Sequence, residues 1–370
     1  MSYRICRRCI MDTTASDIAF DGDGNCNYCS EVLRSSARHD VTDPAERQLR
    51  LEAFVAEVKA AGRGKPYDCI MGVSGGIDSS WALAKAVELG IRPLAVHMDN
   101  GWNSELAQNN IANLIRGLRV DLHTHVIDWE EYRQLMQAFF DADVIDVEIL
   151  YDNAMLAVNY REAARRGLRH ILAGSNTATE GIRFPPGWTW LKFDRRNIEA
   201  IGKGGGVRLR TFPAISTLAY LWYRAVRRIR WISFLDLLDY NKNEALDVLE
   251  RDYGYKRYPY KHYESVFTRF YQGFILPTKF GVDKRRVHLS ALVASGQMTR
   301  DEALRLAEGI AYPSAEALVE DKKYFTKKMG WTSDDLDRYI ARPEKPHSAY
   351  PSERRRWDAL ASTYRRVAVR

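Results

Sequence analysis

The sequence predicts an α/β protein with a doubly wound parallel sheet, preceded by a cysteine-rich module and followed by a mainly helical region. Three observations support this fold class. Two Cys-x-x-Cys pairs come first, short apolar runs then alternate with helical patterns, and helix signals dominate the rest of the chain. We therefore divide the chain into residues 1–35, 36–200 and 201–370.

The first module holds four of the five cysteines of the chain, in two pairs with 16 residues between them. The pairs are Cys6-x-x-Cys9 and Cys26-x-x-Cys29. This spacing is typical of a zinc ribbon, in which four thiolates bind one tetrahedral Zn²⁺ and leave no position for a substrate. A structural zinc ion is therefore expected, with a redox pair or an iron–sulfur cluster as the alternatives.

Four apolar runs predict the strands of the sheet, at residues 69–73, 92–98, 121–127 and 169–173. An amphipathic helix from near Asp43 towards Gly62 leads into the first of them. The intervening helical patterns make the strands parallel, because parallel strands need crossover connections.

Ligands of such sheets bind outside the carboxyl ends of the strands. The second strand ends in His97, Met98 and Asp99, and the fourth in Gly174 and Ser175. We expect these five residues to contact a nucleotide. For Asp99, which precedes Asn and Gly, an ordinary turn is the alternative.

A glycine-rich turn, Ser74-Gly-Gly-Ile-Asp-Ser-Ser80, joins the first strand to the next helix. Its glycines let the backbone approach an anion, its serines donate hydrogen bonds, and the helix N-terminus directs N–H groups to the same place. Pyrophosphate is expected there. The expected ATP-binding residues are Ser74, Gly75, Gly76, Ile77, Asp78, Ser79 and Ser80. Asp78 is also the expected Mg²⁺ ligand, because a carboxylate beside a phosphate requires a bridging cation.

This turn is not a Walker A loop, because no Gly-Lys-Ser/Thr follows it. It resembles the pyrophosphate loop (PP-loop) of the ATP pyrophosphatase superfamily, which includes GMP synthetase, asparagine synthetase and the tRNA-modifying thiolases. The resemblance implies a PP-loop type of sheet and a substrate that is adenylated, not phosphorylated. A plain strand-to-helix connection is the alternative.

Three later segments, 173–181, 256–265 and 281–290, combine hydroxyls, cations and acids. Together with the cysteine pairs they resemble the bacterial N-acetyl sugar amidotransferases of O-antigen and flagellin-glycan biosynthesis, the WbpG and PseA type, over nearly the full chain. The resemblance implies that ammonia replaces the oxygen of an N-acetyl group on a nucleotide-activated sugar. The amide oxygen first attacks the α phosphate of ATP, and an acetamidino group results.

The expected catalytic residues are Asp78, Lys261, Glu264 and Glu180. Lys261 would stabilise charge on the α phosphate, and Glu264 or Glu180 would accept a proton from ammonia. For each Lys or Glu, a surface salt bridge is the alternative. The expected substrate-binding residues are Asn176, Thr177, Arg285 and Arg286, the arginines through bidentate hydrogen bonds.

The fifth cysteine, Cys69, lies in the first strand, where a thiol usually serves only in packing. The chain has no amino-terminal cysteine and no Gly-x-Cys-x-Gly elbow, so it carries no glutaminase nucleophile. A partner must therefore release ammonia from glutamine, and a class I glutaminase is expected.

Hydropathy predicts where the protein is located, and the distribution of charge predicts its partners. The beginning of the chain shows no signal peptide and no apolar run is long enough for a membrane span, so a cytoplasmic protein is expected. The net charge of +7 is matched by residues 200–235, which contain Lys and Arg but no Asp or Glu; a nucleic-acid partner is not expected. Residues 218–235 predict a helix of aromatic residues and arginines, either packed in the C-terminal region or an oligomer contact, or lying on a membrane surface.

The last part of the chain predicts supporting helices. Thr299 and Glu302 have the spacing of a capping box. Residues 342–351 contain three prolines and are expected to form a linker before a basic terminal helix.

Two functions of other classes remain open. One is tRNA modification through adenylation of a base, which also fits the zinc module and the basic charge. The other is a nucleotide-binding subunit that only scaffolds a glutaminase and does not turn over ATP.

Overall fold

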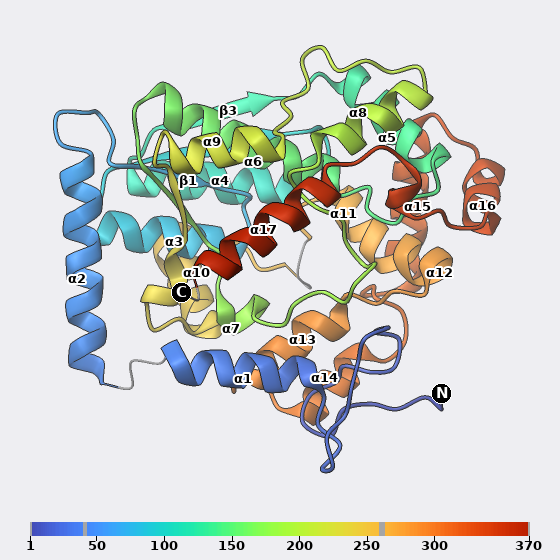
Figure 1. The fold of residues 1–370 in the computed structure, drawn as a ribbon, viewed down its shortest axis with the longest axis horizontal. Coiled ribbons are helices and arrows are strands. Elements are labelled where there is room, and N and C mark those ends of the chain that lie inside the picture. The colour runs from blue at the N-terminus through green and yellow to red at the C-terminus, as the bar shows by residue number, and fades with distance from the viewer. Residues whose placement is uncertain (1, 40–42, 259–262, 369–370) are drawn as a thin grey trace.

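The computed structural model describes residues 2–39, 43–258 and 263–368 (Figure 1). Its centre is a five-stranded parallel sheet in the order β3-β2-β1-β4-β5. The strands are β1 (Cys69–Gly72), β2 (Pro93–Asp99), β3 (Leu122–Val126), β4 (His170–Ala173) and β5 (Arg230–Ser233). The parallel α/β fold is confirmed, and the four expected strands are found to within one residue at each end.

Helices cover both faces of the sheet. On one face lie α3 (Ile77–Glu88), α2 (Pro44–Ala61), α4 (Glu105–Leu118) and α10 (Lys242–Tyr253), which share one apolar cluster with β1. On the other lies α6 (Ile149–Arg165), and α5 (Trp129–Asp141) and α8 (Arg195–Gly204) pack against each other beyond it. The side chains of β1 alternate between two apolar clusters: Ile70 packs with residues of α6, whereas Cys69 and Met71 pack with residues of α2, α3, α4 and α10. Burial on both faces explains why the strands are continuously apolar.

An ion pair holds the amino ends of β1 and β2 together. Asp68 precedes β1 and is 1% exposed, and Arg92 precedes β2. Arg92 Nη2 lies 2.6 Å from Asp68 Oδ1. The same guanidinium donates to the carbonyl oxygens of Gly62 and Lys65, at 3.2 and 3.0 Å. A buried carboxylate requires such donors. Because Asp68 and Arg92 directly precede β1 and β2, their pairing holds the starts of the two strands side by side.

The C-terminal region is helical, as expected. Its helices are α11 (Val266–Phe270), η2 (Tyr271–Ile275), α12 (Leu276–Phe280), α13 (Arg285–Ala294), α14 (Arg300–Ala307), α15 (Ala315–Met329), α16 (Ser333–Ala341) and α17 (Arg354–Ala368). The capping box of Thr299 and Glu302 begins α14. This region packs on the sheet domain through aromatic side chains: the ring centroids of Trp331 and Tyr339 each lie 5.1 Å from that of Phe140 on α5.

The remaining helices are short or lie at the edges: α1 (Asn27–His39), α7 (Thr177–Glu180), α9 (Thr217–Ala225), η1 (Phe234–Leu237) and η3 (His347–Ala349). No helix among the described residues is both long and apolar enough to cross a lipid bilayer.

The expectation of one helix over residues 218–235 was wrong. Helix α9 ends at Ala225, Arg228 adopts a φ of 55°, and the chain then forms β5 beside β4. Trp231 and Ile232 are an aromatic and a β-branched residue, which favour a strand, and pairing with β4 outweighs the helical pattern. The sheet thus includes residues beyond 200, while the division at residues 35 and 200 stays a prediction.

The expected linker at residues 342–351 is instead anchored in the core. His347 is 2% exposed, its Nε2 accepts a hydrogen bond from the backbone N–H of Asp146 at 3.1 Å, and its Nδ1 lies 2.8 Å from Asn197 Oδ1. Burial lowers the pKa of His347 to about 4, which keeps Nε2 available as an acceptor. The segment therefore fixes α17 relative to the sheet domain.

Replacing Arg92 with Met should lower the free energy of unfolding by about 2 kcal/mol, because Asp68 would stay buried without its cation. Urea denaturation followed by circular dichroism measures this. The matched control is Arg50→Met, which breaks an exposed pair with Glu46 and should cost less than about 0.5 kcal/mol. Equal stability of the two variants would contradict the role given to the Arg92 pair.

Candidate active site

The turn between β1 and α3 has the geometry of an anion site. Helix α3 begins at Ile77, and its N-cap is Gly76, which has no side chain to bond the first N–H groups. The N-cap residue therefore places no side chain in front of those groups or of the positive end of the helix dipole. Asp78 lies in the first turn of α3.

Hydroxyl groups shape this turn from inside. Ser74 Oγ accepts a hydrogen bond from the N–H of Gly76 at 3.2 Å and lies 3.3 Å from Ser79 Oγ. Ser79 Oγ in turn donates to the carbonyl oxygen of Gly76 at 3.1 Å. Ser80 is 1% exposed, so its hydroxyl is part of the packing beneath the turn.

Two tyrosines that the sequence analysis did not identify hold the turn from outside. The hydroxyls of Tyr255 and Tyr258 donate to the carbonyl oxygen of Gly75 at 3.1 and 3.0 Å. Burial raises the pKa of both phenols, so both keep their protons. Gly75 has a φ of +82°, and a Cβ there would lie 2.8 Å from the carbonyl oxygen of Ala107 on α4, so only glycine fits.

Asp78 lies at the meeting point of three segments. The hydroxyl of Tyr240 donates to its Oδ1, and Thr179 Oγ1 lies 3.5 Å from its Oδ2. Burial and the charge of Asp78 raise the pKa of Tyr240, which therefore stays a donor. The role of Asp78 as a Mg²⁺ ligand stays a prediction, and its carboxylate is placed beside the start of α3 as that role requires.

The end of β4 approaches the turn closely. A Cβ on Gly174 would lie 2.6 Å from the backbone carbon of Asp78 and the nitrogen of Ser79. The next residue, Ser175, shares a hydrogen bond with Ser233 of β5, with their Oγ atoms 2.9 Å apart. Gly174 and Ser175 thus lie beside the turn, as expected, although contact with ATP stays a prediction.

The two expected substrate-binding residues of this loop have local structural contacts. Asn176 is the N-cap of α7 and accepts a hydrogen bond from the N–H of Thr179 at 2.8 Å. The N–H and Oγ1 of Thr177 donate to the carboxylate of Asp236, at 2.6 and 3.2 Å. Glu180 ends α7 and is exposed.

At the end of β2, His97 and Asp99 also shape the backbone. His97 Nδ1 lies 2.9 Å from the carbonyl oxygen of Val73, and Asn103 Nδ2 lies 3.0 Å from His97 Nε2, which places the proton on Nδ1. Asp99 Oδ1 accepts from the N–H of Gly101 at 2.8 Å, the turn geometry named as its alternative. Met98 is buried, and its role with adenine stays a prediction.

Glu264 lies over the turn. A Cβ built on Gly76 would be 3.5 Å from Glu264 Oε1. The backbone positions it, since Ser104 N–H donates to the carbonyl oxygen of Glu264 at 2.8 Å. Glu264 is thus brought to the expected pyrophosphate site, whereas Lys261 lies outside the described residues.

Arg285 and Arg286 do not have the arrangement expected for substrate binding. Arg285 pairs with Asp283 at 2.8 Å and donates to the carbonyl oxygens of residues 306–310, at and just past the end of α14. Arg286 pairs with Asp12 at 2.8 Å and donates to the carbonyl oxygen of Ile10 at 3.0 Å. Their donors satisfy backbone carbonyls and a buried carboxylate, so both have structural roles in this fold.

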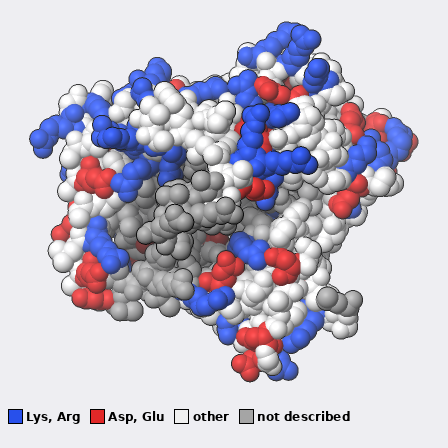
Figure 2. All heavy atoms as spheres, in the orientation of Figure 1, with Lys and Arg blue, Asp and Glu red and all other residues white. Residues whose placement is uncertain are grey.

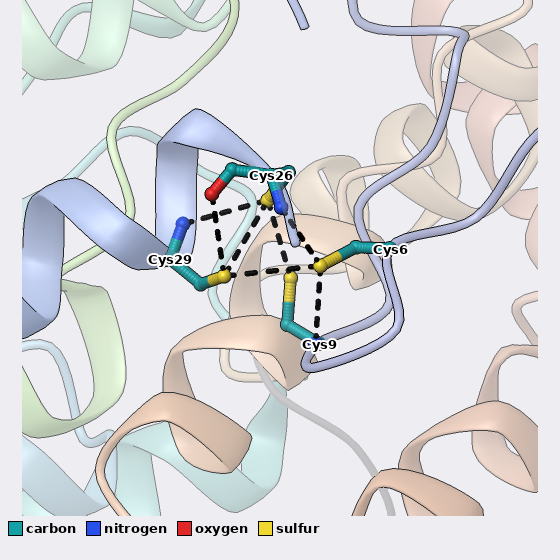
Figure 3. A group of neighbouring side chains, drawn as sticks. All are labelled: Cys6, Cys9, Cys26 and Cys29. Atoms are coloured by element: carbon teal, nitrogen blue, oxygen red, sulfur yellow. Dashed lines mark hydrogen bonds between the residues drawn. The ribbon is translucent and has the colours of Figure 1, made fainter. Parts of the chain in front are cut away.

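The four cysteines of the amino-terminal module converge on one point (Figure 3). Each is 0% exposed, and all four sulfur atoms lie within 4.8 Å of one another. The sulfur of Cys26 is 3.6 Å from those of Cys9 and Cys29, and the sulfurs of Cys6 and Cys29 are 3.8 Å apart. A tetrahedral ion with Zn–S bonds of about 2.3 Å requires S–S distances of about 3.8 Å, so the group can hold one such ion.

Backbone donors surround this cysteine group. The N–H groups of Arg8, Cys9 and Cys26 donate to Cys6 Sγ at 3.4, 3.4 and 3.1 Å. Hydrogen bonds with Cys26 and Cys29 hold the pKa of Cys6 below its ordinary value. For Cys6 both effects favour the thiolate, the form that binds metals, whereas hydrogen bonds within the same group raise the pKa of Cys9 and Cys26. In contrast, burial raises the pKa of Cys69 in β1, so that thiol is inert.

The cysteine module docks on the C-terminal helices. Arg300 Nε donates to the carbonyl oxygens of Cys6 and Cys9, each at 3.1 Å. Ser290 Oγ on α13 accepts from the N–H of Ile10 at 3.1 Å. With the Asp12 pair of Arg286, these contacts join the cysteine module to α13 and the start of α14.

A separate groove of 760 Å³ lies between α2 and the end of α3, lined in part by Leu51, Val55, Asp68 and Arg92. Asp68 and Arg92 precede β1 and β2, so this groove is at the amino ends of the strands. Ligands of parallel sheets bind at the opposite ends. The turn at residues 74–80 is therefore the better candidate active site.

Comparison with known proteins identifies the C-terminal region. Residues 264–364 match the family described as "LPS biosynthesis protein WbpG-like, C-terminal domain". The resemblance to WbpG-type proteins is thus confirmed for this region. No curated protein matches the chain.

Two solved structures show limited similarity. NMN synthetase from Francisella tularensis is 16% identical, with 60% of this chain and 99% of that chain covered and a TM-score of 0.30. The NH3-dependent NAD synthetase from Campylobacter jejuni subsp. jejuni NCTC 11168, in complex with the nitrate ion, is 15% identical, with 56% and 84% covered and a TM-score of 0.30. At this level of similarity, function is argued from the residues of the chain itself.

Replacing Gly174 with Ala should weaken binding of ATP with Mg²⁺ by about tenfold or more, because the new methyl group would push the start of α3 out of place. Isothermal titration calorimetry measures the affinity. The control is Gly204→Ala on α8, where nothing lies within 4 Å of the added Cβ. Unchanged ATP affinity in Gly174→Ala would contradict the proposed site.

Proposed function

We propose that this chain, whose residues 264–364 match the WbpG-like C-terminal domain, is the synthetase subunit of an ATP-dependent amidotransferase. The observation that carries the proposal is the turn at residues 74–80. It combines an uncapped helix N-terminus, a glycine with positive φ and a carboxylate in the first helical turn. Such a turn can hold pyrophosphate while the AMP portion of ATP is transferred to a substrate.

The substrate in this proposal is the N-acetyl group of a nucleotide-activated sugar. An amide carbon is a poor electrophile, so the amide oxygen first attacks the α phosphate, and pyrophosphate leaves. The products of this step are an imidoyl adenylate, pyrophosphate and a proton. Ammonia then adds to the activated carbon and AMP leaves with the former amide oxygen, which gives an acetamidino sugar for O-antigen or other surface glycans.

The chain's own residues have two roles in these steps. The N–H groups at the start of α3 and the hydroxyls of Ser74 and Ser79 bind the leaving pyrophosphate. Glu264, over the turn, accepts a proton from the attacking ammonia. Mg²⁺ held by Asp78 would neutralise phosphate charge in this site.

Ammonia must come from a partner. The chain has five cysteines; four belong to the cysteine group, and Cys69 is buried in β1 with a raised pKa. None of them is an activated nucleophile for glutamine hydrolysis. A class I glutaminase is the proposed partner, with a protected route that keeps ammonia from becoming ammonium.

The surface charge offers limited support to the tRNA alternative. Figure 2 shows acidic side chains interspersed with basic ones on the face it presents, rather than one continuous basic surface. An RNA-binding enzyme would need phosphate contacts from a group of Lys and Arg.

An isotope experiment tests the proposed chemistry. The protein is incubated with ATP, Mg²⁺, ammonium and nucleotide-linked diacetamido sugars that carry ¹⁸O in the acetamido groups. We expect sugar-dependent release of pyrophosphate, a product in which one oxygen is replaced by NH, and AMP that has gained ¹⁸O. Formation of ADP, or AMP without the label, would rule out this mechanism. ATP turnover that requires tRNA would favour the alternative function.

We also propose that the cysteine group holds a structural Zn²⁺. Elemental analysis of the purified protein should find one zinc ion per chain. Cys26→Ser should lose the metal and make residues 1–35 sensitive to protease, because the ion would no longer join the two cysteine loops. Cys69→Ala is the control and should keep its zinc. Iron in place of zinc would support the iron–sulfur alternative.

A further inference from the structure

Helix α9 exposes apolar side chains along its outer face. Leu218, Trp222 and Val226 are 62%, 46% and 64% exposed, and they are spaced four residues apart. Side chains at this spacing lie one above the other on a helix, so the three form a continuous apolar line, which we call the α9 ridge. The proposed chemistry does not use any residue of this ridge.

The opposite face of α9 packs on the protein. The ring centroids of Tyr220 and Tyr223 lie 5.7 and 5.4 Å from that of Tyr160 on α6. At the start of α9, Glu353 Oε2 accepts a hydrogen bond from the N–H of Thr217 at 2.6 Å. These contacts hold α9 in place with its outer face turned to solvent. The α9 ridge is therefore a fixed feature of the surface.

Arginines flank the α9 ridge at both ends. Arg224, Arg227 and Arg228 lie at its carboxyl end and are exposed. The start of α17 adjoins the start of α9, and Arg355 and Arg356 are exposed there. Among the described residues, none of these five arginines pairs with a carboxylate, and residues 200–235 contain no Asp or Glu. Figure 2 shows uncharged atoms over α9, with Lys and Arg on either side.

The charges lie next to the aromatic rings of the helix. The guanidinium carbon of Arg227 lies 5.6 Å from the centroid of the Trp222 ring, and that of Arg224 lies 5.9 Å from the centroid of the Tyr220 ring. Indole rings favour the depth of lipid headgroups, and guanidinium groups bind phosphates. A bilayer surface with anionic headgroups is complementary to both the apolar line and the positive charge.

We propose that the α9 ridge and the arginines at its two ends bind the surface of a bilayer that contains anionic phospholipids. Leu218, Trp222 and Val226 enter the headgroup region, and the arginines pair with lipid phosphates. Helix α9 has nine residues and buries little apolar area in this contact, so the binding is reversible and depends on charge. The contact goes beyond the proposed function and holds the protein at a membrane surface without crossing it.

Cosedimentation with vesicles tests this contact. The protein is mixed, in about 0.1 M NaCl, with vesicles of phosphatidylcholine alone or of phosphatidylcholine with about 30% phosphatidylglycerol. We expect cosedimentation with the anionic vesicles only, and its loss in about 1 M NaCl, where charges are screened. Absence of binding to the anionic vesicles, or equal binding to both kinds, would overturn the proposal. No ATP or sugar is present, so the outcome does not depend on the proposed reaction.

The variant Leu218→Glu tests the α9 ridge itself. It places a carboxylate on the apolar line, and binding to the anionic vesicles should become about tenfold weaker or more. The matched control is Leu49→Glu on α2, which makes the same substitution at a leucine that is 65% exposed and should bind as the original protein does. Both positions are largely exposed, so both variants should fold, which circular dichroism checks. Equal loss of binding in the two variants would contradict a role of the ridge.

The charges are tested by the double variant Arg224→Gln with Arg228→Gln. Binding to the anionic vesicles should again become about tenfold weaker or more, because two contacts with lipid phosphates are lost. The control, Arg63→Gln with Arg116→Gln, removes two exposed charges elsewhere and should bind nearly as well as the original protein.

Sedimentation velocity without lipid examines the rival occupant, a second copy of the chain. A dimer that Leu218→Glu dissociates, together with no binding to vesicles, would make the α9 ridge a contact between copies and would refute the membrane proposal.

Discussion

The architecture of the candidate site depends on how closely the backbone of other segments approaches the turn at residues 74–80. Gly75 leaves no room for a Cβ against the carbonyl oxygen of Ala107, and Gly174 leaves none against the first turn of α3. These contacts bring the end of β4 and the start of α4 against the helix N-terminus. The hydroxyls of Tyr255 and Tyr258 then fix the peptide of Gly75 from a segment 180 residues later. An anion site made of backbone groups needs such rigidity, because its N–H groups must point to one place before the ligand arrives.

Much of the fold follows from short-range patterns. The four apolar runs predicted β1 to β4, and the glycine-rich turn predicted the start of α3. Burial on both faces and the conformation of glycine each leave a pattern within a few neighbouring residues. Strand β5 was missed because residues 218–229 continue a helical pattern. The helix ends because residues 230–233 pair with β4, and a short stretch of sequence does not contain this long-range contact. Cysteine spacing likewise predicted a group of four sulfurs, because two short loops with two thiols each can close on one point.

The candidate site was only partly predictable, for a related reason. The type of a residue shows which interactions its side chain can make. Which of them it makes depends on the groups that the fold places next to it. Arg285 and Arg286 suit bidentate recognition of a ligand, but carbonyl oxygens past α14 and the carboxylate of Asp12 use their donors first. Tyr240, which donates to Asp78, gave no signal because it lies in no motif and its partner is distant in sequence.

The docking of the cysteine module has a consequence for synthesis of the chain on the ribosome. Its anchors, Arg286 and Arg300, are made 257 and 271 residues after Cys29. At about 5–20 residues per second, the module waits roughly 15–55 s for them. The proposed zinc ion would hold its thiols together during that time. Availability of metal in the cell during translation, rather than in the finished enzyme, would then set the yield of correctly assembled protein.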